Sequence, residues 1–435
     1  MSPPRLPCSA YSLLFCSCCL WSLACASRKL GFCSQMTYYD LENSSRTSFM
    51  PSLLHFQTWS RDPRNPVVMN YAWSTVGYPT LFISQSNNTK SCSNETFQAN
   101  LTEYLDTQAY GSLYIAGSES DAAVAMVFRR LIEFNGGKKA KAAGIFNTSE
   151  AAVNSSQYRS VYLNDESIEW YYDPRHRSIT GIGGQLFGSI VFNFVIPEKE
   201  GDERISYFPK TKFTVHSTVV DMNLEGFSFN SSLVGKNGRI AIEMVMLKGR
   251  AVNKDSTIQT ATVDDEYTPS VFRTWEYYFN NRTDPNQAYL QWKPISYQSR
   301  DRKSTKAQEA NLVFPGGAAV HVLGGEVPRG LGSALFNVST TLLNGTAFYM
   351  VIGTDGDENY LNPSRVTWTA VLGFGRAPKD KISIEVVIII IVSIGVPALL
   401  IFLGSFYVMY KKKPWQNIGR GIKRLRRIEG YERIN

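Results

Sequence analysis

Two acidic clusters are the residues of this 435-residue chain most able to do chemistry. The first, Asp264–Tyr267, places carboxylates on adjacent residues. Adjacent side chains point in different directions on a regular backbone, so they form no ready acid–base pair. The second, Asp355–Asn359, offers the hard oxygen ligands that calcium prefers but lacks the full pattern of a calcium-binding loop. We therefore interpret it as a solvated turn.

The remaining candidates for catalysis are weaker still. No nucleophile elbow, phosphate-binding glycine loop or zinc-binding His-Glu-x-x-His motif occurs in the sequence. The histidines are scattered along the chain, at His55, His176, His216 and His321. His216 alternates with Thr214 and Thr218, which predicts a position on the surface of a strand. We expect no catalytic residue, no metal site and no cofactor, although carboxylates on distant strands could still pair as in a glycoside hydrolase.

Asparagine-linked glycosylation is the chemistry that the sequence predicts most strongly. An Asn-x-Ser/Thr acceptor marks a surface position in a secreted domain, and many acceptors on one side of a membrane form a consistent set. The predicted sites are Asn43, Asn87, Asn94, Asn100, Asn147, Asn154, Asn230, Asn281, Asn337 and Asn344.

The N-terminal residues 1–26 are predicted to be a signal peptide. Arg5 supplies a positive charge, and the apolar stretch Tyr11–Leu23 is too short to span a bilayer. Ala24–Ala26 matches the small-x-small cleavage pattern, so we expect cleavage near Ser27. This segment directs the chain into the secretory pathway.

A second apolar segment, Val386–Tyr410, is predicted to be a transmembrane helix. It contains 25 residues without a charge, whereas about 20 suffice to cross a hydrocarbon core of about 30 Å. Lys411–Lys413 follow at once, and positive charge marks the cytosolic side. The sequence therefore predicts a single-pass type I membrane protein, with its N-terminus in the lumen.

The basic tail, residues 411–435, explains most of the net charge. It carries a charge of +7 out of the total of +8, so the lumenal part is nearly neutral and nothing indicates binding to nucleic acid. Tyr431 and Ile434 form a Tyr-x-x-bulky-apolar pattern near the C-terminus, which resembles the sorting signal of lysosomal membrane proteins that clathrin adaptors read. We therefore expect the protein in the lysosomal membrane. An extended peptide can place these two side chains in separate pockets.

Cysteine usage agrees with an oxidising compartment. Five of the seven cysteines lie in the signal peptide, and Cys33 and Cys92 remain after cleavage. Two cysteines in such a compartment most simply form one disulfide.

The lumenal sequence is predicted to be mainly β, with β-sandwich-like layers. Arg239–Leu247 places Ile240, Ile242, Met244 and Met246 on one face of a strand. The turn pair Asn237-Gly238 before it predicts a tight hairpin. Residues 121–135 are predicted to form one amphipathic helix, because apolar residues recur there at helical spacing, at Val124, Val127, Phe128, Leu131 and Phe134.

The lumenal part is longer than one hydrophobic core usually supports. We therefore expect two β-rich subdomains, residues 27–200 and residues 201–385, divided near the charged stretch 198–204.

Several sequence blocks in this order resemble the glycosylated lysosomal membrane protein family. They are Tyr71-Ala72-Trp73-Ser74, Val127–Phe134, Asp264–Tyr267 with Pro269 and Val271-Phe272, Gln291–Pro294 with Tyr297, Trp368 with Leu372–Gly375, and Tyr431–Asn435. The topology matches as well, although the chain keeps only two lumenal cysteines where the family carries more.

The resemblance implies a non-enzymatic accessory subunit of a lysosomal transporter of the major facilitator superfamily, one that exports dipeptides. The glycosylated lumenal domain would protect that transporter from lysosomal proteases. Two alternatives stay open: a membrane-tethered lysosomal hydrolase, and a cell-surface or glycan-binding receptor.

Overall fold

The computed structural model describes most of the strands, three helices and some connections. The described residues are 28–29, 35–39, 50–60, 67–86, 97–115, 122–135, 142–147, 158–163, 167–172, 179–181, 184–201, 209–229, 238–248, 256–261, 273–279, 287–297, 307–313, 320–322, 328–336, 344–353, 365–379 and 384–412. The chain divides into two compact units, residues 1–379 and residues 380–435, which we call the β unit and the anchor unit.

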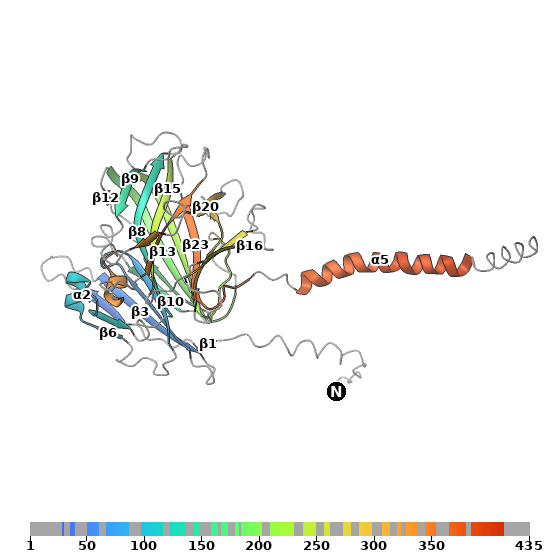
Figure 1. The fold of residues 1–435 in the computed structure, drawn as a ribbon, viewed down its shortest axis with the longest axis horizontal. Coiled ribbons are helices and arrows are strands. Elements are labelled where there is room, and N and C mark those ends of the chain that lie inside the picture. Colours follow the sequence, from blue (N-terminus) through green and yellow to red (C-terminus); the bar gives the residue numbers. More distant parts are fainter. Residues whose placement is uncertain are drawn as a thin grey trace, which may run out of the picture. The chain divides into compact units, whose positions relative to one another are not determined.

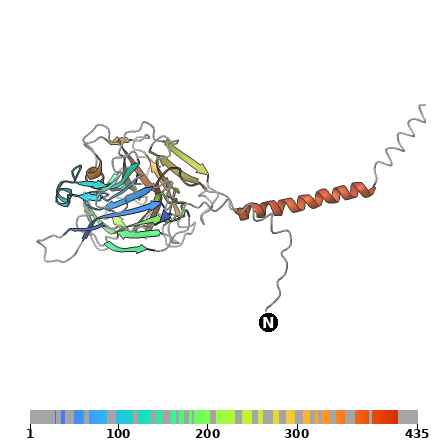
Figure 2. The same cartoon turned by 90° about the horizontal axis from the view of Figure 1, so that it is seen from below.

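Two large antiparallel sheets form the β unit (Figures 1 and 2). The twelve-stranded sheet, here sheet A, contains β1 (Arg28–Lys29), β2 (Gln35–Tyr39), β3 (Met50–Ser60), β4 (Val68–Ser74), β5 (Thr80–Ser86), β8 (Ala123–Asn135), β9 (Ala142–Asn147), β15 (Gly238–Lys248), β19 (Ile295–Tyr297), β20 (Ala307–Val313), β21 (Val320–Val322) and β22 (Asn344–Ile352). The nine-stranded sheet, here sheet D, contains β10 (Tyr158–Leu163), β11 (Ser167–Tyr172), β12 (Ile179–Gly181), β13 (Gly184–Pro197), β14 (Ser217–Phe229), β16 (Ser256–Ala261), β17 (Arg273–Tyr278), β18 (Ala288–Trp292) and β23 (Arg365–Phe374). The predicted mainly β, sandwich-like fold is confirmed.

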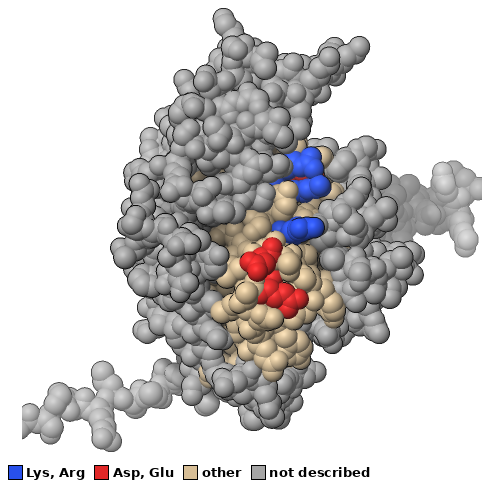
Figure 3. Space-filling view, turned by 90° about the vertical axis from the view of Figure 1, so that its left-hand side faces the viewer, with Lys and Arg blue, Asp and Glu red and all other residues tan. Residues whose placement is uncertain are grey.

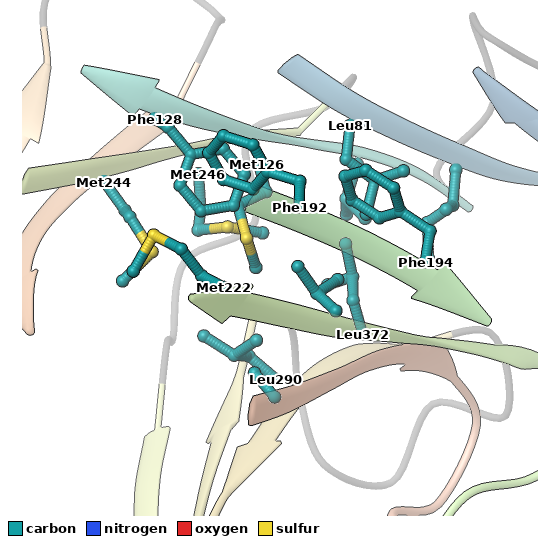
Figure 4. Packing of buried hydrophobic residues seen from close by; sticks show 14 of the residues in the cluster. Leu81, Met126, Phe128, Phe192, Phe194, Met222, Met244, Met246, Leu290 and Leu372 are labelled. Atoms are coloured by element: carbon teal, nitrogen blue, oxygen red, sulfur yellow. The ribbon is translucent and has the colours of Figure 1, made fainter. Parts of the chain in front are cut away.

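The main hydrophobic core joins the facing sides of the two sheets. Trp73 of β4 in sheet A contacts Phe192 and Phe194 of β13 in sheet D, with ring centroids 5.1 and 4.5 Å apart. Phe128 of β8 likewise lies 4.7 Å from Phe192. Figure 4 shows Phe128, Phe192 and Phe194 together with methionine and leucine side chains between the strands. Tilted aromatic pairs of this kind add to the free energy gained by burying their area.

A small cover packs on the other face of sheet A. It consists of the hairpin β6 (Phe97–Ala99) and β7 (Leu113–Ile115), the helix α2 (Leu101–Thr107) between these strands, and α4 (Leu331–Leu335). The amide of Gly111 donates to the carbonyl oxygen of Ala334 at 3.0 Å, so the α2 hairpin and α4 lie side by side (Figure 1). Tyr104 of α2 is buried and its hydroxyl donates to Ser74 Oγ at 2.7 Å, which fixes the cover to β4.

The predicted amphipathic helix at residues 121–135 is wrong, because this segment is the strand β8. Both faces of β8 are buried: Val124 and Phe128 face the core between the sheets, while Val127 faces α4. A β-bulge between Phe128 and Arg130 then shifts the alternation, so that Leu131 points back into the same core. Because both faces of β8 carry apolar residues and the bulge adds one residue, the apolar positions in the sequence resemble the spacing of a helix.

The strand prediction at Arg239–Leu247 is confirmed by β15. Ile240, Ile242, Met244 and Met246 all join the core between the sheets. The predicted tight hairpin before it is wrong, since β15 pairs with β8 and β22, whereas the preceding strand β14 belongs to sheet D. The connection crosses from one sheet to the other.

The predicted division near 198–204 does not separate two folds. The strands β13 and β14 flank that segment and pair with each other within sheet D, and the β unit continues to Lys379. The β unit is therefore divided by sheet and not by chain position. His216 also differs from its prediction, because it lies in the turn before β14. Hydrogen bonds between Thr214 and Ser217 close that turn.

The anchor unit contains the helix α5 (Ile384–Lys412), with Pro397 inside it. Its apolar stretch, Val387–Lys411, is long and apolar enough to cross a membrane, which agrees with the predicted span at Val386–Tyr410. The side chains along this stretch are exposed, as suits a helix whose surroundings are lipid or another protein.

Candidate functional site

Three predicted glycosylation sites fall on described residues, and each lies at an end of an element. Asn100 precedes α2, Asn147 is the last residue of β9, and Asn344 is the first residue of β22. The other seven sites, the predicted disulfide partners Cys33 and Cys92, and the sorting residues Tyr431 and Ile434 lie outside the described residues. The same holds for the acidic clusters at 264–267 and 355–359.

Asn100 has a structural role besides its place in an acceptor sequence. It is exposed, and its Oδ1 accepts the backbone N–H of Glu103 at 3.3 Å, which caps the first turn of α2. Its Nδ2 donates to the Glu103 carboxylate at 3.0 Å. An acceptor asparagine therefore holds the start of the cover helix.

A buried polar row crosses the outer face of sheet D. Asp221 of β14 is fully buried and accepts hydrogen bonds from Asn193 Nδ2 at 3.1 Å and from Thr369 Oγ1 at 2.6 Å. These three residues lie on neighbouring strands at paired positions. These outward polar side chains are buried and bonded to one another.

A second buried carboxylate, Glu276 of β17, accepts the hydroxyl of Tyr278 at 2.6 Å. Asp221 and Glu276 are separated by β23 and β18 in the strand order, which places them at least about 14 Å apart at the usual strand spacing. Glycoside hydrolases need two carboxyl groups within about 5–10 Å. These two buried carboxylates therefore cannot form such a pair.

An ion-pair cluster lies at the bulge in β8. Because the bulge turns two consecutive residues to one face, Arg129 and Arg130 both reach Glu243 of β15, at 3.4 and 3.2 Å. Glu243 is buried, whereas the two arginine side chains are 22% and 30% exposed. Burial raises the pKa of the nearby Tyr349, and the charge of Glu243 raises it further. Figure 3 shows the left-hand side of Figure 1, where acidic side chains of the described residues form one small group beside basic side chains.

His55 is a titratable group whose pKa is strongly lowered by its surroundings. It is buried under the cover, stacked on Phe97 with ring centroids 5.0 Å apart, and its Nε2 lies 3.3 Å from Asn70 Oδ1. Burial lowers the pKa of this imidazole to about 4. In the sequence, His55 is one of four scattered histidines with no feature that marks it as a site. The one sequence feature that indicated its burial is its position in β3, where apolar and polar residues alternate.

The segment after β23 is held against sheet D. Gln287 Nε2 donates to the carbonyl oxygen of Gly375 at 3.1 Å, and Gln291 Nε2 donates to that of Pro378 at 2.9 Å. Between them, Ala377 packs with Val219 and other buried residues of the sheet. Residues 375–379, here the strap, are thus fixed to β18 just before the anchor unit begins.

No group of three or more potential metal ligands occurs among the described residues. The features that the described residues do contain are acceptor asparagines at the ends of elements and an apolar helix long enough to cross a membrane. This combination defines a class: a membrane-anchored glycoprotein whose large domain is a two-sheet β unit.

The chain belongs to the glycosylated lysosomal membrane protein family, whose model matches residues 53–414. It is 25% identical over 370 residues to glycosylated lysosomal membrane protein A of Xenopus laevis, covering 79% of this chain and 83% of that one. It is 23% identical over 382 residues to the Bos taurus protein, covering 85% and 87%. The Homo sapiens protein is 24% identical over 362 residues, covering 80% and 82%.

The comparison with solved structures found a galactose 1-epimerase from Lactobacillus acidophilus. It has a TM-score of 0.33 and 8% sequence identity, and the match covers 81% of this chain and 100% of that one. A likeness this weak says nothing about activity.

Proposed function

We propose that this protein is a non-enzymatic accessory subunit that protects a multispanning lysosomal transporter from proteolysis. The resemblance to the family points to a dipeptide exporter of the major facilitator superfamily as that partner. In this proposal the β unit faces the lumen, the tail faces the cytosol, and Tyr431 and Ile434 bring the complex to lysosomes through a clathrin adaptor.

The observation that carries the proposal is the placement of the glycan acceptors on the β unit. Asn100, Asn147 and Asn344 lie at the ends of elements, where a glycan leaves the sheet faces uncovered. A bulky glycan at such a junction hinders a protease from binding the exposed connections, which are the preferred cleavage sites.

Protection by binding follows from mass action. A protease cleaves the transiently open form of a protein, and a partner that binds only the folded form lowers the population of the open form. A 100-fold excess of partner over the dissociation constant would lower that population about 100-fold, which corresponds to about 2.7 kcal/mol. A lumenal loop of the transporter would therefore be cleaved more slowly when the partner is bound.

The test is to delete the protein and measure the abundance of co-resident multispanning transporters in isolated lysosomes by quantitative mass spectrometry. At least one transporter should fall severalfold and should recover when lysosomal proteases are inhibited. Its messenger RNA should stay constant, which separates degradation from reduced synthesis. Normal abundance of every co-resident transporter after deletion would refute the proposal.

A further inference from the structure

The outer face of the β6–β7 hairpin carries an exposed aromatic ring. Leu113 and Ile115 of β7 are buried, whereas Tyr114 between them points outward and is 40% exposed. Among the described residues outside α5, the large apolar side chains that stay exposed are Tyr110 and Tyr114. An exposed tyrosine on a two-stranded hairpin offers a flat apolar surface with a polar edge.

Asn100 continues the ladder that places Tyr114. Gln98 pairs with Tyr114, and Ala99 pairs with Leu113. The ladder continues with a backbone hydrogen bond, in which the N–H of Asn100 donates to the carbonyl oxygen of Ser112 at 2.8 Å. Since side chains alternate along a strand, Asn100 and Gln98 share the face on which Tyr114 stands. Asn100 is thus the diagonal neighbour of Tyr114, at about 7–8 Å, which is within reach of a long or aromatic side chain.

The capping geometry leaves room for a sugar at Asn100. N-glycosylation replaces one hydrogen of Nδ2 and leaves Oδ1 intact, so the bond from the Glu103 amide to Oδ1 is retained. The residue is exposed, and the acceptor Thr102 is exposed as well. A glycan can therefore occupy this asparagine in the folded protein, with its first sugar beginning on the face of Tyr114.

We propose that the first N-acetylglucosamine on Asn100 packs its apolar C–H face on the ring of Tyr114 and holds the start of α2 in place. The contact removes apolar surface of both partners from water, and it joins β7 to the cap of the helix through the sugar. This inference rests on the lumenal placement in the proposed function, but it requires no transporter partner.

The experiment compares four full-length glycoproteins in detergent: wild type, Tyr114→Ala, Thr102→Ala, and the double variant. Thr102→Ala abolishes the acceptor but keeps the Asn100 cap. The readout is hydrogen exchange of the α2 amides, including Tyr104 and Gln108, whose bonds go to Asn100 and Tyr104. Glycopeptide mass spectrometry first measures occupancy at Asn100.

Tyr114→Ala should speed exchange in α2 about fivefold in the glycosylated background, and less than twofold when Thr102 is alanine. Trimming the glycan to its first sugar should preserve the larger effect. Tyr110→Ala is the matched control, an exposed tyrosine whose effect should be the same in both backgrounds.

Three results would overturn the inference: an empty Asn100, an equal effect of Tyr114→Ala in both backgrounds, or glycan dependence at Tyr110 in place of Tyr114. None of them bears on transporter abundance after deletion, so the proposed function is judged separately.

Discussion

The side-chain amide of Gln291 donates to the carbonyl oxygen of Pro378 at 2.9 Å, which ties the strap at residues 375–379 to β18 of sheet D. The strap is the last part of the β unit before the anchor unit. Because it is bonded and partly buried, the chain that continues toward the membrane starts from a fixed position on the sheet. Without this bond, the same residues would be an accessible linker, which is a preferred site of proteolysis.

Replacing Gln291 with leucine should make the strap more sensitive to trypsin. The variant keeps the side-chain size but removes the donor to Pro378, so the strap should open more often. Arg376 and Lys379 are exposed and supply cleavage sites within the strap. Loss of about 1–1.5 kcal/mol of local stability predicts cleavage roughly 5–10 times faster, measured by release of the β unit from detergent-solubilised protein.

Gln98→Leu is the control for Gln291→Leu, since Gln98 is exposed and lies far along the chain in β6. It should leave cleavage at Arg376 and Lys379 unchanged. Equal rates for wild type and Gln291→Leu would show that the Gln287–Gly375 hydrogen bond and the packing of Ala377 fix the strap without the Gln291 bond.

His55 should make the β unit less stable as the pH falls from neutral to lysosomal values. Its pKa is about 4 in the folded protein and about 6.5 in the unfolded chain. Between these two values the unfolded chain binds a proton that the folded protein does not, so stability falls with decreasing pH. At pH 5 this group alone lowers the free energy of unfolding by about 2 kcal/mol relative to pH 8.

The variant His55→Gln should remove that contribution. In denaturant unfolding between pH 4.5 and 8, the free energy of unfolding should fall less steeply with decreasing pH for the variant. In the steepest region, the difference in slope should correspond to about one proton fewer taken up on unfolding. Above pH 7.5 the two pH dependences should run parallel, which serves as the internal control. An unchanged slope would mean that His55 has nearly the same pKa in the folded protein and in the unfolded chain.

Glu243→Gln should destabilise the β unit by about 2–3 kcal/mol. The change leaves two guanidinium groups facing each other at the bulge without the carboxylate they share. The value lies below that of a fully buried pair because Arg129 and Arg130 are partly exposed to solvent. Arg130→Gln should cost less, since Arg129 still reaches Glu243. Thermal unfolding can rank these variants against Arg329→Gln, an exposed arginine expected to change stability by less than about 0.5 kcal/mol.

The sequence predicted local features better than long-range ones. The alternation in β15 correctly placed Ile240 and Met244 on the buried face, because the two-residue period of a regular strand does not depend on which strands pair with it. In β8 the bulge at Arg129 broke that period, and a bulge depends on the opposite strand, Glu243 included. No single-sequence pattern carries that information.

The same limit applies to buried polar groups. Asp221 follows Val220 and precedes Met222, so its outward position on β14 could be read from the sequence. Its complete burial could not, because Asn193 and Thr369 reach it from strands distant in the chain. The apolar anchor, by contrast, is defined by composition and length alone, and its predicted bounds agree with those of α5 within two residues.

Tyr431→Ala tests where the protein works and separates the proposed subunit from a cell-surface receptor. The substitution removes the aromatic group that an adaptor would bind, while Ile434 and the basic residues of the tail remain. A lysosomal subunit should then accumulate at the plasma membrane severalfold, measured by surface biotinylation, and its lysosomal pool should fall. Tyr407→Ala, within α5, is the matched control because it removes a tyrosine without altering the tail pattern. A receptor that normally resides at the surface would instead show an unchanged surface fraction and slower endocytosis, and that result would favour the receptor alternative.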